Sequence, residues 1–134
     1  MSFDFRVWDI ANKKMYYSLD FENFTINGEF LTFTTNGGTL IGPMNLCDVI
    51  IMNYTGFKDK DGVKAYDGDM IPYFFDDAVL GIIKYGDYRD WNGGKFTRHI
   101  GFYVEFSDIK HKNTQRKDLG YWLNNSCISG NFYE

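Results

Sequence analysis

Residues 24–34 have the sequence Phe-Thr-Ile-Asn-Gly-Glu-Phe-Leu-Thr-Phe-Thr, in which an Asn-Gly pair separates two runs of alternating apolar and polar residues. Such alternation is typical of a half-buried β-strand, because successive side chains point to opposite faces. Asn-Gly between two such runs is the strongest short-range signal for a β-hairpin. Both residues tolerate the positive φ of a type I′ turn. We therefore expect Asn27 and Gly28 to form a two-residue turn with positive φ at both positions.

The amino-terminal part of the chain predicts a second hairpin. Residues 3–9 alternate, with Phe3, Phe5 and Val7 on one face, although Trp8 places a large apolar ring on the other. The polar stretch Ala11–Lys13 has turn composition, and Lys14–Phe21 has the composition of a partner strand.

Downstream of the first hairpin, Thr35–Pro43 holds three glycines and a proline. We interpret it as a linker between two regions, residues 1–45 and 46–134. Further runs with strand-like composition are Leu46–Tyr54, Met70–Phe75, Ala78–Tyr85, Lys95–Phe106 and Ile128–Tyr133. Pro72 lies inside the second of these runs, which indicates an edge strand or a bulge.

Turns separate these runs, and the segments outside them show little helical periodicity. Charged or glycine-containing turns are expected at Lys58–Gly62, Tyr66–Asp69, Asp76–Asp77 and Asn92–Gly94. The polar segment 107–118 has room for one short helical turn. The sequence thus predicts a mostly-β chain with little helix: an amino-terminal β-hairpin region followed by a small barrel or sandwich.

Composition bounds the class of protein. The 134 residues are 19% aromatic and carry a net charge of −4, which argues against disorder and against general nucleic-acid affinity through bulk charge. No apolar run is long enough to span a bilayer, and the chain opens without a basic-then-apolar leader. We interpret Cys47 and Cys127, which are far apart in sequence, as buried, reduced and metal-free residues of a cytoplasmic protein.

Motifs for catalysis or cofactor binding are missing from the sequence. No two of Cys47, Cys127, His99 and His111 have a zinc-site spacing, and the glycine of Asp59–Gly62 comes too early for a calcium loop. The acids in the predicted turns are better explained as caps of backbone N–H groups. Gly93-Gly94-Lys95 lacks the earlier glycine of a phosphate-binding loop, and no nucleophile elbow is present. We therefore predict no catalytic, cofactor-binding or metal-binding residues and no enzymatic activity.

One segment has a composition suited to nucleic acids. Residues 110–117 hold four full positive charges and no acid, and aromatic residues precede them in the same half of the chain. Small β-barrels bind single strands with a cationic groove and aromatic stacking platforms. The candidate binding surface consists of Tyr85, Tyr88, Trp91, Lys110, Lys112, Arg116 and Lys117. The simpler interpretation, a solvated loop beside core or interface aromatics, is favoured over it.

Aromatic content also predicts self-association. A small domain buries only about two-thirds of its surface, so some rings remain outside. The first two strands have apolar residues on both faces, which gives Trp8, Tyr16 and Tyr17 as candidate contacts in a homo-oligomer. The alternative is that the two halves of one chain cover each other.

Three stretches resemble the YopX-like family of phage and prophage proteins. The most specific is Met52–Gly62, continuing to Tyr66–Asp69, and the others are the opening Phe5–Asp9 with Lys13–Tyr16 and the ending Ile128–Glu134. Pro72, just after the turn, departs from the family pattern. The resemblance implies a phage- or prophage-encoded protein with an SH3-like barrel in its second half, and neither an activity nor catalytic residues come with it.

Two functions remain open from the sequence. The first is a non-enzymatic binding or assembly module, a homo-oligomer that engages a host or phage protein in the host-cell cytoplasm. The second is a nucleic-acid-binding accessory protein that uses the basic loop 110–117 and nearby aromatics.

Overall fold

The chain divides into two compact units, and the division lies inside a strand. The computed structural model describes residues 4–73, 76–92, 94–106 and 117–134. The boundary between the units is at Asn53 and Tyr54, within strand β6 (Val49–Lys58), rather than at the expected 45/46 position. The first half of β6 pairs with β1 (Phe5–Asp9), and the second half pairs with β7 (Lys64–Tyr66).

The first hairpin of the chain joins β1 to β2 (Lys14–Tyr17). Asp9 shapes its turn, because its carboxylate accepts hydrogen bonds from the backbone and the side-chain amide of Asn12, at 3.2 and 2.8 Å. The expected partner strand Lys14–Phe21 is interrupted: Ser18–Asp20 forms a 3₁₀ turn, and Phe21 begins the next strand.

The predicted hairpin at residues 24–34 is confirmed, but its turn is shifted by one residue. Strands β3 (Phe21–Asn27) and β4 (Phe30–Thr35) pair with Asn27 opposite Phe30, so the two central residues are Gly28 and Glu29. Gly28 has φ +64°, whereas Asn27 and Glu29 are not among the residues with positive φ. Glycine in the first central position is the pattern of a type II′ turn, so the expectation for Asn27 is wrong.

The glycine-rich segment is not a linker. Residues 36–39 form a tight turn in which the N–H of Thr35 donates to the carbonyl of Thr39 at 2.8 Å. Strand β5 (Leu40–Asn45) follows at once and completes the sheet β3–β4–β5. A shift in the β4–β5 register is centred near Gly42, which explains why a glycine belongs in this strand.

The core of the first unit gathers side chains from four strands, with the rings of Phe21 and Phe33 stacked at 4.2 Å. Its fully or nearly fully buried members are Val7, Phe21, Leu31, Phe33 and Val49. On the other face of β1, Trp8 is only 7% exposed. Both faces of β1 are thus covered within one chain, so this strand does not need a second subunit for cover, contrary to the argument from sequence.

The turn after β6 confirms for Asp59 the expected role of the acids as caps of backbone N–H groups. Asp59 is buried, and its Oδ1 accepts from the N–H groups of Asp61 and Val63, each at 2.9 Å. Its Oδ2 accepts from the N–H of Ile128 at 3.0 Å, which ties the carboxy-terminal segment to the turn. The rings of Tyr54 and Tyr66 face each other across the β6–β7 pair at 5.7 Å.

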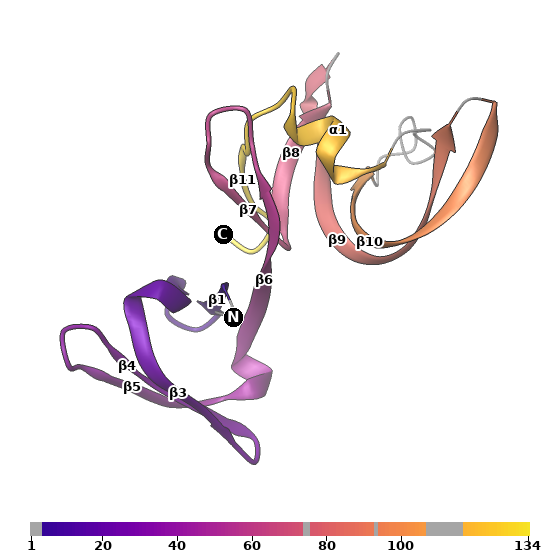
Figure 1. Cartoon of the computed structure of the whole chain (residues 1–134). Helices are drawn as coiled ribbons and strands as arrows, with labels where there is room; N and C mark the ends of the chain where they lie inside the picture. The colour runs from indigo at the N-terminus through magenta and orange to yellow at the C-terminus, as the bar shows by residue number, and fades with distance from the viewer. Residues whose placement is uncertain (1–3, 74–75, 93, 107–116) are drawn as a thin grey trace. The chain divides into compact units, whose positions relative to one another are not determined.

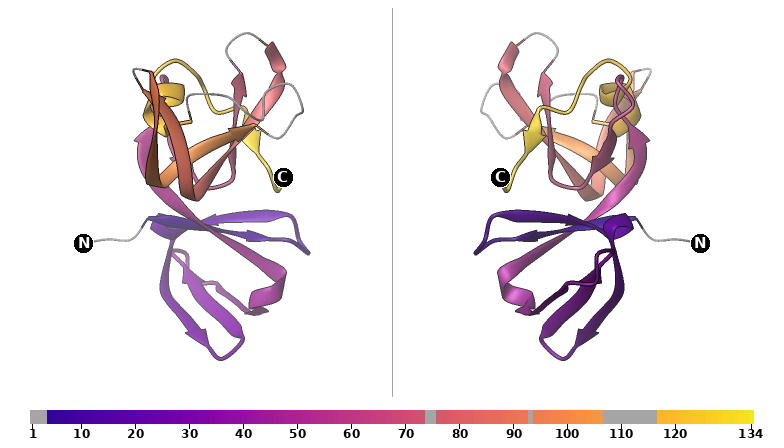
Figure 2. Two further views of the ribbon diagram at one scale, coloured as in Figure 1. Left: turned by 90° about the vertical axis from the view of Figure 1, so that its right-hand side faces the viewer. Right: turned by 90° about the vertical axis from the view of Figure 1, so that its left-hand side faces the viewer.

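The second unit contains a sheet of order β10–β9–β8–β11, which curls into an open, barrel-like arrangement (Figure 2). It includes β8 (Asp69–Tyr73) and the two-residue strand β11 (Gly130–Asn131), much shorter than the expected final strand. Pro72 lies beyond the β11 pairing and at a register irregularity with the next strand, as predicted for an edge or bulge.

A long hairpin replaces the separate strands expected between residues 78 and 106. Strand β9 (Asp76–Asn92) pairs along its outer part with β10 (Lys95–Phe106) in an unbroken register of twelve residue pairs. It bends as a continuous arm in Figure 1. Residues Gly86 and Gly101 are opposite each other in the middle of the arm.

In the core of the second unit, a short helix, α1 (Leu119–Leu123), packs against the base of this hairpin. The carboxylate of Asp118 caps the helix by accepting the N–H of Tyr121 at 3.1 Å. The predicted mostly-β class with little helix is confirmed, and the curled sheet is compatible with an SH3-like barrel. In the part of the chain that the structure covers, no helix is long and apolar enough to cross a membrane.

Candidate binding face of the long hairpin

One face of the β9–β10 hairpin begins in the core and continues into solvent. Because the register is unbroken, every second residue pair points to the same side. At the base of the arm this side carries Ile83 and Val104, both fully buried. Farther out the same side carries the residues that we call the hairpin face: Tyr85, Asp87, Arg89, Phe96, Arg98 and Ile100.

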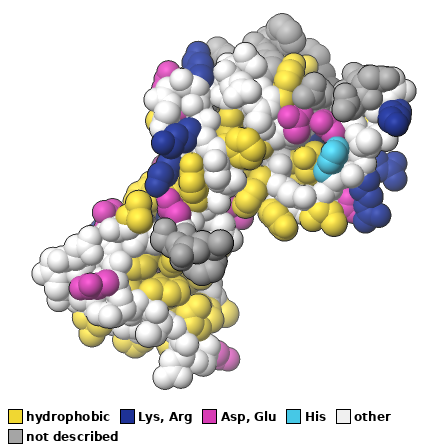
Figure 3. Space-filling view, viewed as in Figure 1, with side chains coloured by type: hydrophobic (Ala, Val, Ile, Leu, Met, Phe, Trp, Pro, Cys, Tyr) yellow, Lys and Arg dark blue, Asp and Glu magenta, His cyan; other side chains and the backbone are white. Residues whose placement is uncertain are grey.

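Apolar side chains on the hairpin face are strongly exposed. Tyr85 is 63% exposed, Ile100 72% and Phe96 56%. The ring of Tyr85 meets the half-buried ring of Phe102 edge-on, with centroids 5.0 Å apart, so the exposed series is continuous with the core. Figure 3 shows the other side of the arm, where a histidine is visible, with basic side chains along the outer edge. Exposed apolar residues in a contiguous series are typical of a contact surface.

Charged residues occupy the middle of the hairpin face. Nε of Arg98 donates to both carboxylate oxygens of Asp87, at 3.0 and 2.8 Å. This hydrogen bond, together with the positive charge of Arg98, holds the pKa of Asp87 below its usual value. Arg89, directly opposite Arg98, is exposed and has no ion pair within the described portion of the chain.

The opposite face of the hairpin is a packed aromatic column. The ring of Tyr88 stacks between His99, at 5.4 Å, and Tyr103, at 5.1 Å. Gly86 and Gly101 lie between the two tyrosines on this face, and their lack of side chains lets the rings lean together. Burial, and then the charges of Asp90 and Asp118, raise the pKa of Tyr88. Because its half-buried ring is packed between two others, we interpret Tyr88 as a structural residue.

The residues predicted from sequence as one binding surface are not all brought together. Tyr85 is on the hairpin face, whereas Tyr88 is on the opposite face. Lys117 is half-buried, and its backbone N–H donates to Asp90 at 2.8 Å while its carbonyl accepts from Val104. The side chain of Trp91 and the residues Lys110, Lys112 and Arg116 lie outside the described residues.

Five residues of the hairpin face were missed from sequence: Asp87, Arg89, Phe96, Arg98 and Ile100. For Phe96, Arg98 and Ile100 the sequence held a signal of a shared face, because they occupy alternate positions in the run 95–106 directly after the Gly93-Gly94 turn. The alternation predicted a shared face for Ile100 and Phe102, which the register confirms. It could not show that this face leaves the core halfway along the strand.

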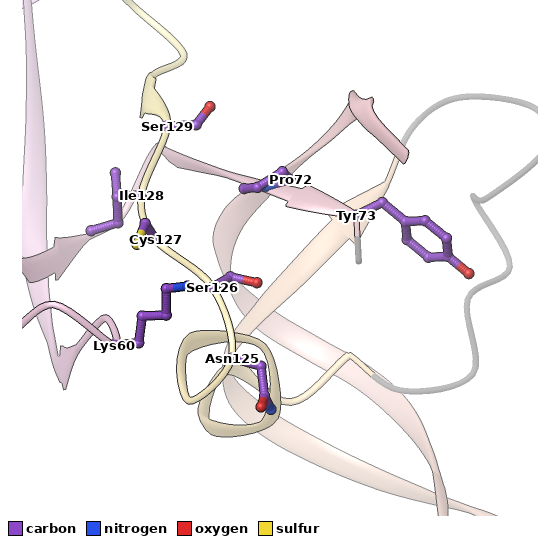
Figure 4. A pocket seen from close by; sticks show the side chains of 8 residues that line it. All are labelled: Lys60, Pro72, Tyr73, Asn125, Ser126, Cys127, Ile128 and Ser129. Atoms are coloured by element: carbon purple, nitrogen blue, oxygen red, sulfur yellow. The ribbon is translucent and has the colours of Figure 1, made fainter. Parts of the chain in front are cut away.

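The same unit also has a pocket of about 440 Å³ beside the carboxy-terminal segment (Figure 4). Lys60, Tyr73 and residues 125–129 line it, together with Pro72. Cys127, one of its lining residues, donates its thiol to Asp61 at 2.8 Å. That hydrogen bond raises the pKa of Cys127, which keeps the group as a weakly nucleophilic thiol at neutral pH.

The cysteines do not behave as predicted. Cys47 is exposed and Cys127 is half-buried, so their interpretation as buried apolar residues is wrong. Both are free thiols in the structure. Over the residues that can be described, no group of three or more His, Cys, Asp or Glu side chains is arranged to hold a metal ion.

Comparison with known proteins adds one finding. The sequence model of the family described as YopX protein matches residues 4–134, nearly the whole chain. No curated protein matches the chain in sequence.

Proposed function

The chain belongs to the YopX protein family, and we propose that it is a phage- or prophage-encoded accessory protein that acts as a non-enzymatic binding module in the host-cell cytoplasm. One observation carries the binding role. The side of the β9–β10 hairpin that forms the core of the second unit continues outward as Tyr85, Ile100 and Phe96, each more than half exposed. Leaving such side chains in water has a cost that a bound partner removes.

The hairpin is suited to a binding role because its shape is fixed without a partner. The unbroken pairing of β9 and β10 and the column of Tyr88, His99 and Tyr103 support the hairpin face from behind. A surface that is already ordered loses little conformational entropy when it binds.

Replacing Ile100 with serine is expected to weaken partner binding by about tenfold or more, because burying an isoleucine side chain contributes about 1.5–3 kcal/mol. The measurement is retention of proteins and nucleic acids by the immobilised chain from cells that carry the phage or prophage, quantified for both classes. Leu40→Ser is the matched control, since Leu40 is a strand aliphatic residue with a similar exposed fraction, 65%. Equal retention by Ile100→Ser and wild type would remove the hairpin face from the proposal.

Self-association is the second part of the proposal, and β2 supports it. Among the described strands, β2 is at the edge of its sheet, and an edge strand offers a template for pairing with a second chain. Of the three residues named from sequence, Trp8 is buried, Tyr16 packs against the core, and Tyr17 is 38% exposed.

We expect light scattering at micromolar concentration to give a mass above that of the monomer, and Tyr17→Ser to reduce it by removing an exposed ring beside the β2 edge. Tyr133→Ser, which removes an equally exposed tyrosine, 39% exposed, is the control. A monomer mass that does not change with concentration would contradict self-association.

A further inference from the structure

We propose that the hairpin face binds single-stranded nucleic acid; this inference rests on the proposed function and names the ligand of the same surface. The first argument is charge. The hairpin face carries Arg89, Arg98 and one acid, Asp87, which is a net charge of +1 on a chain whose net charge is −4. A locally positive surface on an acidic protein directs an anionic ligand to that surface.

The second argument is the order of side chains along the face. From the base outward, the aromatic pair Tyr85 and Phe102 comes first, then Ile100 beside Asp87, then Arg89 beside Arg98, and finally Phe96 near the tip. The Tyr85 and Phe96 positions are six residue pairs apart along the hairpin, about 20 Å at the rise of a β-strand. Two exposed rings with Arg89 between them match a strand whose bases stack on the rings while a phosphate meets the guanidinium group of Arg89; the guanidinium group of Arg98 is already paired with Asp87.

The exposed rings of Tyr85 and Phe96 favour a single strand over a duplex as the ligand. In double-stranded DNA the π-faces of the bases are already stacked on each other, so they offer nothing to Tyr85 or Phe96. A single strand presents free π-faces of every base, and stacking on aromatic side chains is tolerant of sequence. The arm is therefore suited to single strands without a strong sequence preference.

Fluorescence anisotropy of a labelled oligothymidylate of about 15 nucleotides, within the range of site sizes of small β-barrels, tests the proposal. We expect binding by the wild-type chain that is stronger than binding to a duplex of equal length and that weakens as salt rises. Tyr85→Ala and Phe96→Ala should each reduce affinity by about fivefold or more. Arg89→Gln should reduce affinity and lower the slope of log K against log salt by about 0.7, and Arg89→Lys should restore that slope.

Phe30→Ala and Lys13→Gln are the controls, because both residues are exposed in the first unit. The proposal is overturned if the wild-type chain does not bind the oligonucleotide, if duplex binds equally well, or if the hairpin variants bind as the controls do. If the wild-type chain does not bind the oligonucleotide, but retains a protein that Ile100→Ser does not retain, the proposed function stands and its ligand is a protein. Oligonucleotide binding that the hairpin variants do not alter overturns this inference, and the retention experiment with Ile100→Ser still decides the proposed function.

Discussion

Gly42→Ala is expected to lower the free energy of unfolding by at least about 3 kcal/mol, which combines left-handed backbone strain with overpacking. Gly42 has φ +104°, a conformation that residues with a side chain rarely adopt. An added Cβ would lie 2.6 Å from the carbonyl oxygen of Leu31, 3.2 Å from the N of Met44 and 3.3 Å from the Cα of Thr32. All three are backbone atoms, so a side-chain rotation cannot relieve the contact, and Leu31 is anchored in the core.

Gly38→Ala separates the two contributions to this loss. Gly38 also has positive φ, +87°, but a Cβ there would meet no atom within 4 Å. It should cost about 1–2 kcal/mol, the backbone strain alone. Urea unfolding followed by circular dichroism gives both values. Equal losses for the two variants would show that the close approach of β5 to β4 at Gly42 carries no energy.

Gly42 also shows why the sequence misled the interpretation of residues 35–43. Several glycines close together are found in flexible linkers and also in tight turns and bulged strands. Which of these structures a glycine belongs to depends on which backbone lies next to it. At Gly42 that backbone is Leu31, eleven residues earlier, and the two come together only in the folded chain. The residues whose role is local, by contrast, were predictable: the Asp59 turn and the Tyr66–Asp69 turn both form as expected, with Gly68 at φ +90°.

In the candidate site, too, the sequence could not show which side chains share a face. Tyr85 and Tyr88 were grouped with Trp91 as aromatic residues near a glycine-rich turn, and the two tyrosines are three residues apart. In a single continuous strand an odd spacing places two side chains on opposite faces, whereas a turn between them would have removed that constraint. Gly86, between the two, made such a break plausible from sequence. Its pairing with Gly101 keeps β9 continuous and separates the two tyrosines.

The Asp59 turn connects segments that are distant in sequence. Besides the three N–H groups bound to its carboxylate, the backbone N–H of Asp59 donates to the carbonyl of Val63 at 2.8 Å, and the N–H of Lys60 donates to Ser126. Burial by itself raises the pKa of Asp59, but the hydrogen bonds from Ile128, Val63 and Asp61 outweigh it and hold the pKa below the usual value. The folded chain thus favours the ionised carboxylate.

Asp59→Asn is therefore expected to cost about 3 kcal/mol at pH 7. Three charge-assisted hydrogen bonds weaken, and the new amide group turns a donor toward one of the N–H groups. Asp61→Asn is the control in the same turn. Asp61 is exposed, and the hydrogen bond shown for its carboxylate is the one from the Cys127 thiol, so its replacement should cost less than about 1 kcal/mol.

The effect of Asp59→Asn should depend on pH in a direction fixed by the lowered pKa. Because the folded pKa is below the unfolded value of about 3.9, the ionised carboxylate contributes its full stability above that value. The contribution is lost as pH falls through the lower, folded pKa. Urea unfolding of wild type and Asp59→Asn from pH 7 to about pH 2.5 should give a constant difference down to about pH 5 and a narrowing one below about pH 4. A difference that persists undiminished at the acid end would mean that the shape of the side chain, and not its charge, holds residues 61, 63 and 128 together.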